Sequence, residues 1–328
     1  MTEDEIKEAI DELRNNAASG ADGFPAILLK QCKDALATPL QIFWNKCMEC
    51  SYIPERLKFS IIAPLFKGGS KSDPANYRPV ALTSHLIKIY EKTIRKKITT
   101  FMEECNSFNE NQHGFRAGRS CLTQLLGHYD NIVNLLETGH NVDVVYLDFS
   151  KAFDKVDLNI LLAKANKLGI QGKLLEWIKE FLTNRNQSVI VNGKLSSKRP
   201  VISGVPQGSV LGPLLFLILI GDIDKDIVDS IVTSFADDTR AKKGLKSEED
   251  AVQLQNDLFR IYHWAIANNM KFNSLKFELL RYGRNQELKE KTCYVTPEWE
   301  LIEEEDDIKD LESPYRMTVL SKRISTTS

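Results

Sequence analysis

The sequence predicts an α+β protein, because two kinds of hydrophobic pattern share its 328 residues. Long segments repeat apolar residues at helical spacing, beginning with Ile6, Ala9 and Ile10. Shorter runs are β-branched and aromatic, as in Val142 to Asp148, and these predict strands. A chain of this length with 42% hydrophobic residues can bury one large core or two modest ones.

The N-terminal part is predicted to be mainly helical. Thr2 and Glu5 fit a capping box that opens the first helix. Pro54 ends the second helical region, since proline interrupts a helix. Helices are expected over residues 3–13, 27–50 and 84–105, and over a segment that ends near residue 136.

A hairpin with glycines at its tip is a candidate triphosphate site. It joins Phe59–Leu65 to Tyr77–Leu82 and carries Lys67 and Arg78. Arginine forms paired bonds to phosphate oxygens and lysine supplies a point charge. The lysine and glycine run at its tip lacks the spacing of a P-loop. A solvated loop is the alternative interpretation of the same residues.

The second half alternates strands with helices. Asn192-Gly193 predicts a hairpin turn, and the apolar run Leu214–Ile220 predicts a buried helix that is too short to span a bilayer. Helices are also expected over residues 158–168, 174–182 and 251–265, and strands over 188–191, 199–202, 231–232, 239–243 and 272–282, the last carrying Lys276.

Charge and cysteine content favour an intracellular protein and allow, without requiring, a basic groove. The net charge is −2, but the last 42 residues hold 11 acidic and 6 basic residues, which leaves 34 acidic and 37 basic residues before them. The body is therefore slightly basic and compatible with a nucleic-acid groove. Six cysteines without a framework, and no apolar N-terminal stretch, indicate the cytoplasm or nucleus and no secretion.

Asp237 and Asp238 stand side by side at the tip of a predicted tight hairpin. Adjacent carboxylates repel each other, so a buried pair implies a bound metal or a shared proton. In isolation, such a pair is most often a solvated turn. Asp148 ends another predicted strand, and if the hairpin pairs beside it, three carboxylates converge in a setting that suits Mg²⁺.

A second candidate region lies between Gln112 and Ser120. Two arginines, Arg116 and Arg119, alternate there with an aromatic residue and glycines. This composition suits contact with a nucleic-acid phosphate backbone. His113 has no second histidine at ligand spacing, so a structural role is expected for it.

Taken together, the motifs resemble those of one family, the reverse transcriptases of non-LTR (LINE-type) retrotransposons, especially the jockey-like branch. The blocks follow the family's order and approximate gaps, and they cover roughly residues 22–283. They are Asn76-Tyr77-Arg78-Pro79-Val80-Ala81-Leu82-Thr83-Ser84, Gln112-His113-Gly114-Phe115-Arg116, Tyr146-Leu147-Asp148-Phe149-Ser150-Lys151-Ala152-Phe153-Asp154-Lys155-Val156, Ser203-Gly204-Val205-Pro206-Gln207-Gly208-Ser209-Val210-Leu211-Gly212-Pro213 and Phe235-Ala236-Asp237-Asp238-Thr239.

The resemblance implies a right-hand polymerase with fingers and a palm, the palm being an antiparallel sheet backed by helices. Residues 1–140 would form the N-terminal helices and fingers, and residues 141–283 the palm with the catalytic aspartates. Residues 284–328 would be an acidic post-palm remnant and tail, partly disordered. Nothing after the palm resembles a helical thumb, so the thumb is expected to be absent or vestigial and the domain to be truncated at both ends.

The resemblance also implies the chemistry. A primer 3′-hydroxyl attacks the α-phosphate of a dNTP with two Mg²⁺ ions, or Mn²⁺, present. Asp148, Asp237 and Asp238 would be catalytic and bind the metals, with Phe149 in the same site. Phe153 would exclude the ribose 2′-hydroxyl. The expected dNTP-binding residues are Lys67, Arg78, Phe153, Gln207, Gly208 and Lys276, and Ser209 would cap the following helix.

The expected partners are an RNA template with a DNA primer, dNTPs, and an endonuclease acting in trans. The alternative is a non-catalytic, nucleic-acid-binding remnant of such an element. The intact aspartates favour preserved chemistry, whereas the expected truncation favours the remnant. An intron-encoded maturase fits the block around Asp148 less well.

Overall fold

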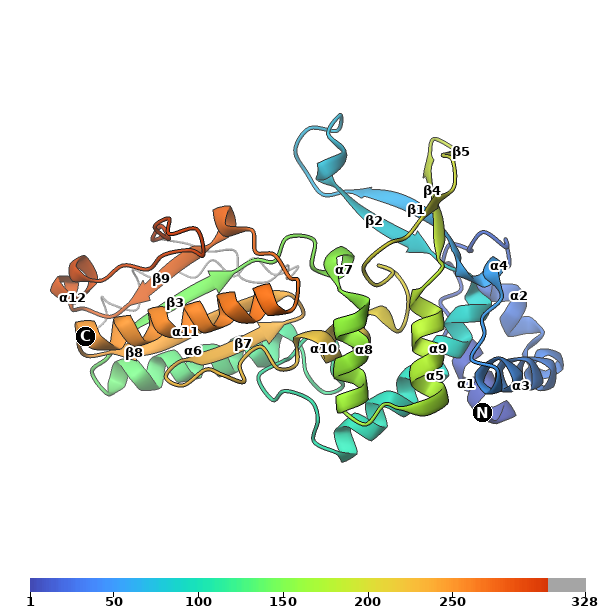
Figure 1. Ribbon diagram of the computed structural model, residues 1–328, viewed down its shortest axis with the longest axis horizontal. Helices are drawn as coiled ribbons and strands as arrows, with labels where there is room; N and C mark the ends of the chain where they lie inside the picture. Colours follow the sequence, from blue (N-terminus) through green and yellow to red (C-terminus); the bar gives the residue numbers. More distant parts are fainter. Residues whose placement is uncertain (306–328) are drawn as a thin grey trace. The chain divides into compact units, whose positions relative to one another are not determined.

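The computed structural model describes residues 1–305, which form two compact units (Figure 1). The first unit comprises residues 1–107 and 156–219. The second comprises residues 108–155 and the chain from residue 220 onward. Both of the ranges expected as fingers and palm, 1–140 and 141–283, are divided between the units, so those boundaries stay predictions.

The first unit is mainly helical. Its capping box is present as expected, since Thr2 accepts the Glu5 N–H and Glu5 accepts the Thr2 N–H. The region predicted as one helix over residues 27–50 is two helices that meet at Cys32. The helices are α1 (Glu3–Asp11), α2 (Ala26–Gln31), α3 (Lys33–Glu49), α4 (Glu55–Lys58), α5 (His85–Glu104), α8 (Leu158–Lys167), α9 (Gly172–Leu182) and α10 (Gly212–Ile220), with a 3-10 turn η1 (Pro74–Asn76).

Three buried aromatic side chains form the centre of this unit. Trp44 of α3 stacks on Tyr90 of α5, with ring centroids 4.4 Å apart. Trp177 of α9 meets Tyr90 edge-on at 4.8 Å. Because aromatic rings bury large areas in fixed geometries, these contacts hold the three helices together.

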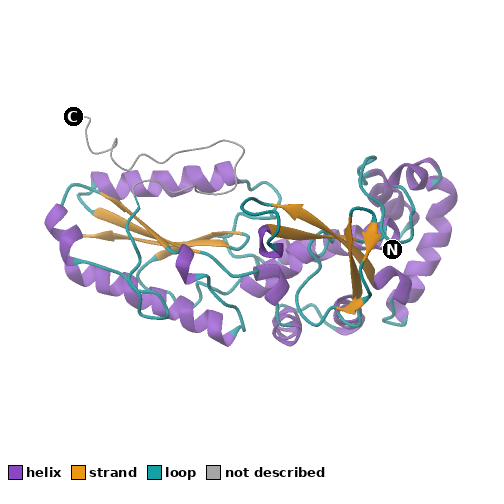
Figure 2. Ribbon diagram, turned by 90° about the horizontal axis from the view of Figure 1, so that it is seen from above, coloured by secondary structure: helices purple, strands orange, loops and turns teal. Residues whose placement is uncertain are grey.

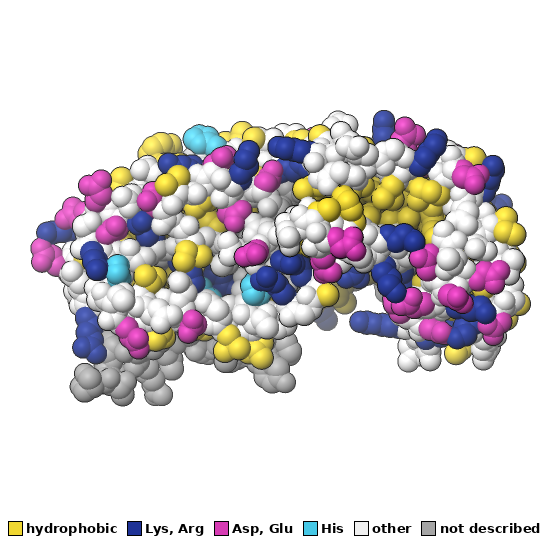
Figure 3. Space-filling model, turned by 90° about the horizontal axis from the view of Figure 1, so that it is seen from below, with side chains coloured by type: hydrophobic (Ala, Val, Ile, Leu, Met, Phe, Trp, Pro, Cys, Tyr) yellow, Lys and Arg dark blue, Asp and Glu magenta, His cyan; other side chains and the backbone are white. Residues whose placement is uncertain are grey.

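Charged side chains cover the outer faces of α1 and α5. Lys96 and Lys97 of α5 pair with Glu8 and Glu5 of α1, at 2.7 and 2.6 Å. On the face drawn in Figure 3, acidic and basic side chains lie next to one another over the first unit. The basic side of α5 is therefore largely offset by α1.

A small sheet extends from the helices of the first unit. β1 pairs antiparallel with β2 and parallel with β4, which also pairs with two short strands. The expected hairpin is thus confirmed, with Leu65 opposite Arg78. The strands are β1 (Phe59–Phe66), β2 (Tyr77–Leu82), β4 (Asn186–Val191), β5 (Lys194–Leu195) and β6 (Arg199–Pro200).

The second unit is built on a four-stranded antiparallel sheet in the order β7-β8-β3-β9. Figure 2 shows this sheet between two long helices, α6 and α11. The elements are α6 (Cys121–Glu137), β3 (Asn141–Leu147), α7 (Ala152–Lys155), β7 (Ile231–Phe235), β8 (Asp238–Leu245), α11 (Glu248–Ala267), η2 (Ser274–Lys276), β9 (Glu278–Tyr282) and α12 (Gln286–Lys291). An antiparallel sheet backed by helices is what the sequence predicts for the palm.

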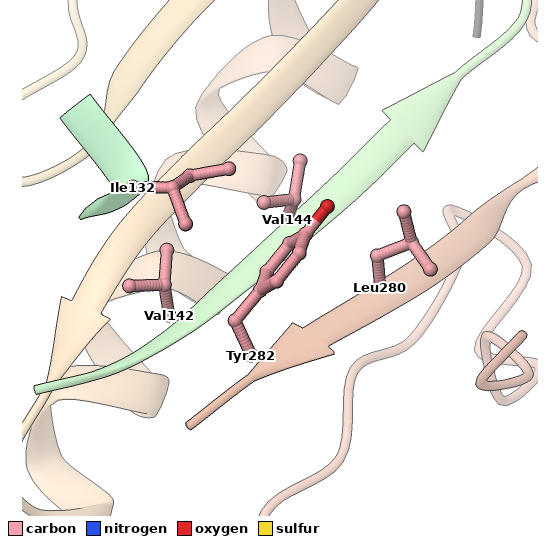
Figure 4. Close-up of a cluster of buried hydrophobic side chains, with 5 residues drawn as sticks. All are labelled: Ile132, Val142, Val144, Leu280 and Tyr282. Carbon is pink, nitrogen blue, oxygen red and sulfur yellow. The ribbon is translucent and has the colours of Figure 1, made fainter. Parts of the chain in front are cut away.

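The sheet packs against α6 through an apolar cluster (Figure 4). Val142 and Val144 point to this side from β3, and Leu280 and Tyr282 join them from β9. Ile132 of α6 covers them and is fully buried. Val145 and Leu147 on the opposite face of β3 are buried as well, so both faces of this central strand are covered.

The segment after the sheet is ordered up to the end of the described residues. Leu279 of β9 donates its N–H to Glu303 and accepts the Glu305 N–H, at 3.1 and 2.9 Å. Tyr294 donates to the buried Asp143 carboxylate at 2.7 Å. Residues 284–305 therefore pack on the sheet, and the rest of the predicted tail lies outside the described residues.

Candidate active site

Asp237 and Asp238 lie at the tip of the β7–β8 hairpin, as expected. Phe235 pairs with Asp238, so only Ala236 and Asp237 form the turn. Ala236 has φ +56, a left-handed conformation that L-residues adopt at a cost. The turn therefore depends on contacts that hold Ala236 in place.

Asp148 follows β3 at the same end of the sheet. Leu147, the last residue of β3, pairs with Thr239 of β8. Asp148 follows Leu147, and Asp238 precedes Thr239, so both aspartates lie one position beyond the last residue pair of β3 and β8. Three aspartates from two distant parts of the chain follow adjacent strand ends, as a palm site requires.

The Asp148 side chain, however, bonds to residues near β9. Its Oδ2 lies 3.2 Å from the Lys276 ammonium and accepts a hydrogen bond of 3.4 Å from Asn273 Nδ2. Asn273 also donates its backbone N–H to the Asp148 carbonyl at 2.8 Å. The Asp148 carboxylate therefore already has a cationic partner.

Within residues 1–305, no three His, Cys, Asp or Glu side chains gather in a way that could hold a metal ion. The Asp148 side chain bonds to Lys276 and Asn273, and the expected convergence of three carboxylates stays a prediction. The donor set still fits a hard divalent cation, since all available ligands are oxygen atoms. Strand register brings the three aspartates to one end of one sheet.

Lys276 does not lie on a strand, contrary to expectation. It ends the 3-10 turn η2, and the strand begins only at Glu278. The turn closes through hydrogen bonds from Lys276 N to Asn273 O and from Phe277 N to Ser274 O, at 2.9 and 3.1 Å. This turn directs Lys276 back toward Asp148.

The two phenylalanines after Asp148 differ in environment. Phe149 is buried and its ring stacks on Phe272 at 4.4 Å, so only its backbone carbonyl is available to a metal. Phe153, the expected sugar gate, lies on α7 and is half-buried. The exposed Phe115 meets it edge-on at 6.2 Å.

The expected nucleic-acid-binding arginines also hold their own loop together. Arg116 donates to the Asn109 carbonyl at 2.9 Å, and its guanidinium lies over the Phe108 ring. Arg119 donates to the Glu110 carbonyl at 2.5 Å and lies 3.1 Å from His113. Burial and the neighbouring arginines lower the pKa of His113, which agrees with its expected structural role.

Gln112 joins this loop to the aspartate hairpin. It is 4% exposed, and its Oε1 accepts from the Ala236 N–H at 3.0 Å and from the Gly114 N–H at 2.8 Å. Its Nε2 donates to the Ala236 carbonyl at 3.2 Å. Gln112 thus bonds to both polar groups of the residue that precedes Asp237.

In the first unit, Lys67 and Arg78 lie on the same hairpin. Both side chains are exposed. The Lys67 N–H donates to the Asn76 carbonyl at 2.9 Å, which extends the ladder one step beyond the Phe66–Tyr77 pair. Leu65 lies opposite Arg78, and Lys67 is two residues after Leu65. Because strand residues two apart share a face, this pairing places Lys67 and Arg78 on the same side of the hairpin.

The loop with Gln207 and Gly208 is anchored to β2 of that hairpin. The Gln207 carbonyl accepts the Ala81 N–H at 2.6 Å. Gly208 has φ +109, and a Cβ there would lie 2.7 Å from the Ala81 carbonyl oxygen, so the close approach requires glycine. Ser209 Oγ accepts the Gly212 N–H at 3.0 Å, which confirms the expected cap of α10.

Glu91 holds the far end of this loop. It is fully buried on α5, and its Oε2 accepts the N–H groups of Val210 and Leu211 at 2.7 and 2.9 Å. Burial raises the pKa of Glu91, against the opposing effects of these hydrogen bonds and of Arg185. A buried carboxylate thus fixes the entry into α10.

One groove of about 330 Å³ lies away from every predicted site residue. It runs between α1 and α5 and is lined by their ion-paired charges, among them Glu12 and Lys92. Because these charges already neutralise one another, the groove has no obvious ligand.

A sequence model of the family described as "Reverse transcriptase (RNA-dependent DNA polymerase)" matches residues 69–304. The chain belongs to this reverse transcriptase family. The match includes Arg78 on β2, the Gln112 loop and all three aspartates. The predicted resemblance to non-LTR reverse transcriptases is thereby confirmed.

Two curated relatives of this chain come from fly elements. One is "Probable RNA-directed DNA polymerase from transposon X-element" of Drosophila melanogaster, 31% identical over 83% of this chain and 30% of its own length. Another is "RNA-directed DNA polymerase from mobile element jockey" of the same species, 30% identical over 84% of this chain and 31% of its own length. The chain thus spans less than a third of the length of these relatives.

Among solved structures, the reverse transcriptase resembles "apo telomerase from Candida Tropicalis truncated from C-terminal domain". The TM-score is 0.54 at 10% identity, and the match covers 71% of this chain and 52% of the telomerase chain. This likeness concerns the fold alone. It confirms the α+β fold expected of a polymerase palm and fingers. No helix within residues 1–305 has the length and apolar character needed to cross a membrane.

Proposed function

We propose that this chain is the polymerase domain of a non-LTR retrotransposon and that it extends a primer 3′-hydroxyl with dNTPs on an RNA template. One observation carries the proposal. In a chain of the reverse transcriptase family, Asp148 follows β3 and Asp238 begins the neighbouring strand β8, so Asp148 and the turn with Asp237 lie at the same end of one antiparallel sheet.

Asp148, Asp237, Asp238 and the Phe149 carbonyl would hold divalent cations, with Mg²⁺ as the proposed physiological ion and Mn²⁺ as a substitute. When bound, such ions activate the attacking hydroxyl and offset charge on the phosphates. Asp148 can bind a metal ion only after its carboxylate separates from the Lys276 ammonium. An ion pair with 64% and 30% exposed side chains is weak enough for that exchange.

Each unit contributes its own residues to substrate binding in this proposal. In the first unit, Lys67 and Arg78 bind phosphate oxygens, and Gln207 and Gly208 contact the incoming nucleotide. In the second, Phe153 excludes the ribose hydroxyl. Lys276, released from Asp148, would neutralise the leaving pyrophosphate.

Arg116 and Arg119 would contact the nucleic-acid backbone, because a guanidinium presents several N–H donors to phosphate oxygens. The six cysteines are all free, in agreement with the proposed intracellular compartment.

The test is primer extension on poly(rA)·oligo(dT) with dTTP and either Mg²⁺ or Mn²⁺. We expect incorporation by the wild-type chain and a loss of at least about a hundredfold in Asp237→Asn/Asp238→Asn, because two metal ligands lose their charge. Asp226→Asn is the matched control, since Asp226 is an exposed aspartate of the same unit. Equal incorporation by the wild type and the double variant would leave the non-catalytic remnant as the correct interpretation.

A further inference from the structure

The turn that carries the two aspartates contains a strained residue. Ala236 has φ +56, although it is not glycine and is buried. A left-handed conformation costs an L-residue about 1 to 2 kcal/mol, so neighbouring contacts must hold it. The orientation of Asp237 depends on this residue, because the two share a peptide bond.

Gln112 supplies those contacts. Its carboxamide accepts from the Ala236 N–H and donates to the Ala236 carbonyl, at 3.0 and 3.2 Å. A primary amide thereby satisfies both polar groups of Ala236, as a neighbouring strand would. Since Gln112 is 4% exposed, water cannot easily replace it in either bond.

The backbone around Gln112 keeps its side chain in register with the turn. Ser234 of β7 donates to the Asn111 carbonyl and accepts the His113 N–H, each at 3.0 Å. The residues beside Gln112 therefore continue the sheet at its β7 edge. The amide is aimed by this pairing and by its bond to the Gly114 N–H at 2.8 Å.

Gly114 allows the close approach. A Cβ at this position would lie 2.3 Å from the Ala236 nitrogen and 3.0 Å from the Phe235 carbonyl carbon. Both are backbone atoms and cannot rotate away. Any side chain at residue 114 would push the loop from the turn and weaken the two Gln112–Ala236 bonds.

We propose that Gln112 is a positioning residue for the catalytic aspartates: it fixes the Ala236–Asp237 peptide and so sets the affinity of the site for divalent cations. The inference rests on the proposed function, since it assigns Gln112 a role in the metal site proposed there. Gln112 touches neither metal nor substrate. It acts through the backbone, as residues that orient metal ligands commonly do.

The test compares Gln112→Met with Gln124→Met. Gln124 is a matched control, because it is 3% exposed in the same unit and its amide atoms have no hydrogen-bond partner within residues 1–305. Both substitutions conserve volume and remove an amide, so only the first deletes the contacts with Ala236. Gly114→Ala provides an independent second route, with the glutamine retained.

Three measurements are made on each full-length chain. Hydrogen exchange should show the Ala236 N–H exchanging at least about tenfold faster in Gln112→Met and Gly114→Ala. Mn²⁺ affinity, followed by electron paramagnetic resonance without substrate, should fall about tenfold to a hundredfold. In primer extension, saturating Mn²⁺ should restore much of the rate, while KM for dNTP stays near that of Gln124→Met.

Equal Ala236 exchange and equal Mn²⁺ affinity in Gln112→Met and Gln124→Met would overturn the inference. If Gln112→Met does not fold, Gln112→Glu is the second variant. It keeps an oxygen that accepts the Ala236 N–H and loses the donor to the Ala236 carbonyl. An unchanged Mn²⁺ affinity in this variant would then overturn the inference. A wild-type chain that binds Mn²⁺ but incorporates no dTTP would refute the proposed function alone, because the exchange and binding readouts need no turnover.

Discussion

The Lys276 ammonium lies 3.2 Å from the carboxylate of Asp148, a proposed metal ligand, and would compete with a cation for it. Removing Lys276 should therefore favour cation binding. An exposed ion pair contributes up to about 1 kcal/mol, so Lys276→Met should tighten Mn²⁺ binding by up to about fivefold. The exposed Lys271 provides the control variant Lys271→Met. Mn²⁺ titration without nucleotide gives both values, and equal affinities would show that Lys276 does not compete.

Phe153→Ala should admit ribonucleotides. The planar ring is proposed to fill the space that a 2′-hydroxyl needs, and removing it opens that space. We expect the preference for dNTP over rNTP in kcat/KM to fall by about tenfold or more. Phe259→Ala is the control, since Phe259 is also half-buried in the second unit. An unchanged preference in primer extension would refute the gate.

Asp257 should make the stability of the second unit depend on pH. It is fully buried on α11 and accepts the N–H groups of Val228, Asp229 and Ser230, the last at 2.7 Å. Burial alone raises the pKa of Asp257, but these bonds and Arg260 outweigh it, so the pKa lies below its usual value. A depressed pKa gives stability that is present above about pH 4 and lost as the pH falls through the folded-state value.

Asp257→Asn should accordingly destabilise the protein by about 1 to 3 kcal/mol at pH 7, because buried N–H groups lose a charged acceptor. The difference from wild type should shrink as the pH approaches 3. Urea unfolding at pH 7 and at pH 3 measures the difference in unfolding free energy, with Asp226→Asn as the exposed control. A difference that stays constant between the two pH values would contradict the assignment.

Glu91 should behave in the opposite sense. Its pKa is raised by burial, so the folded protein binds the proton more tightly than the unfolded chain. This group's contribution to stability therefore falls as the pH rises from about 4 through the folded-state pKa.

Glu91→Gln keeps an acceptor oxygen for Val210 and Leu211 and should flatten that pH dependence. Glu91→Ala leaves both N–H groups without an acceptor and should cost about 1 to 3 kcal/mol more. Thermal unfolding between pH 5 and pH 8 separates the two, with the exposed Glu103→Gln of the same helix as reference. Indistinguishable Gln and Ala variants would show that the loop does not rely on this acceptor.

Local patterns predicted the elements well, because their causes lie within a few residues. The capping box of α1, the β1–β2 hairpin and the tight β7–β8 turn follow from neighbouring side chains. The pairing of β3 beside β8 is not local, since Leu147 and Thr239 are far apart in sequence. Only the resemblance to a family supplied that expectation.

The positions of Lys276 and Gln112, which the sequence did not predict, depend on partners that are distant in the chain. Lys276 leaves the predicted strand because Asn273 bonds to Asp148, 125 positions earlier. Gln112 was assigned only to a nucleic-acid loop, and its partner Ala236 is 124 positions away. A glutamine two residues before a glycine is the available signal, but nothing in the sequence indicates which backbone the amide meets.

The order of the strands has a consequence during synthesis. β3 is flanked by β8 and β9, which leave the ribosome about 90 and 130 residues after it. Until then both edges of an almost wholly buried, apolar strand are open to other chains. A nascent chain of this protein thus carries the strand before Asp148 with at least one open edge while about 130 further residues are made, and a product that stops before residue 238 never pairs it with β8.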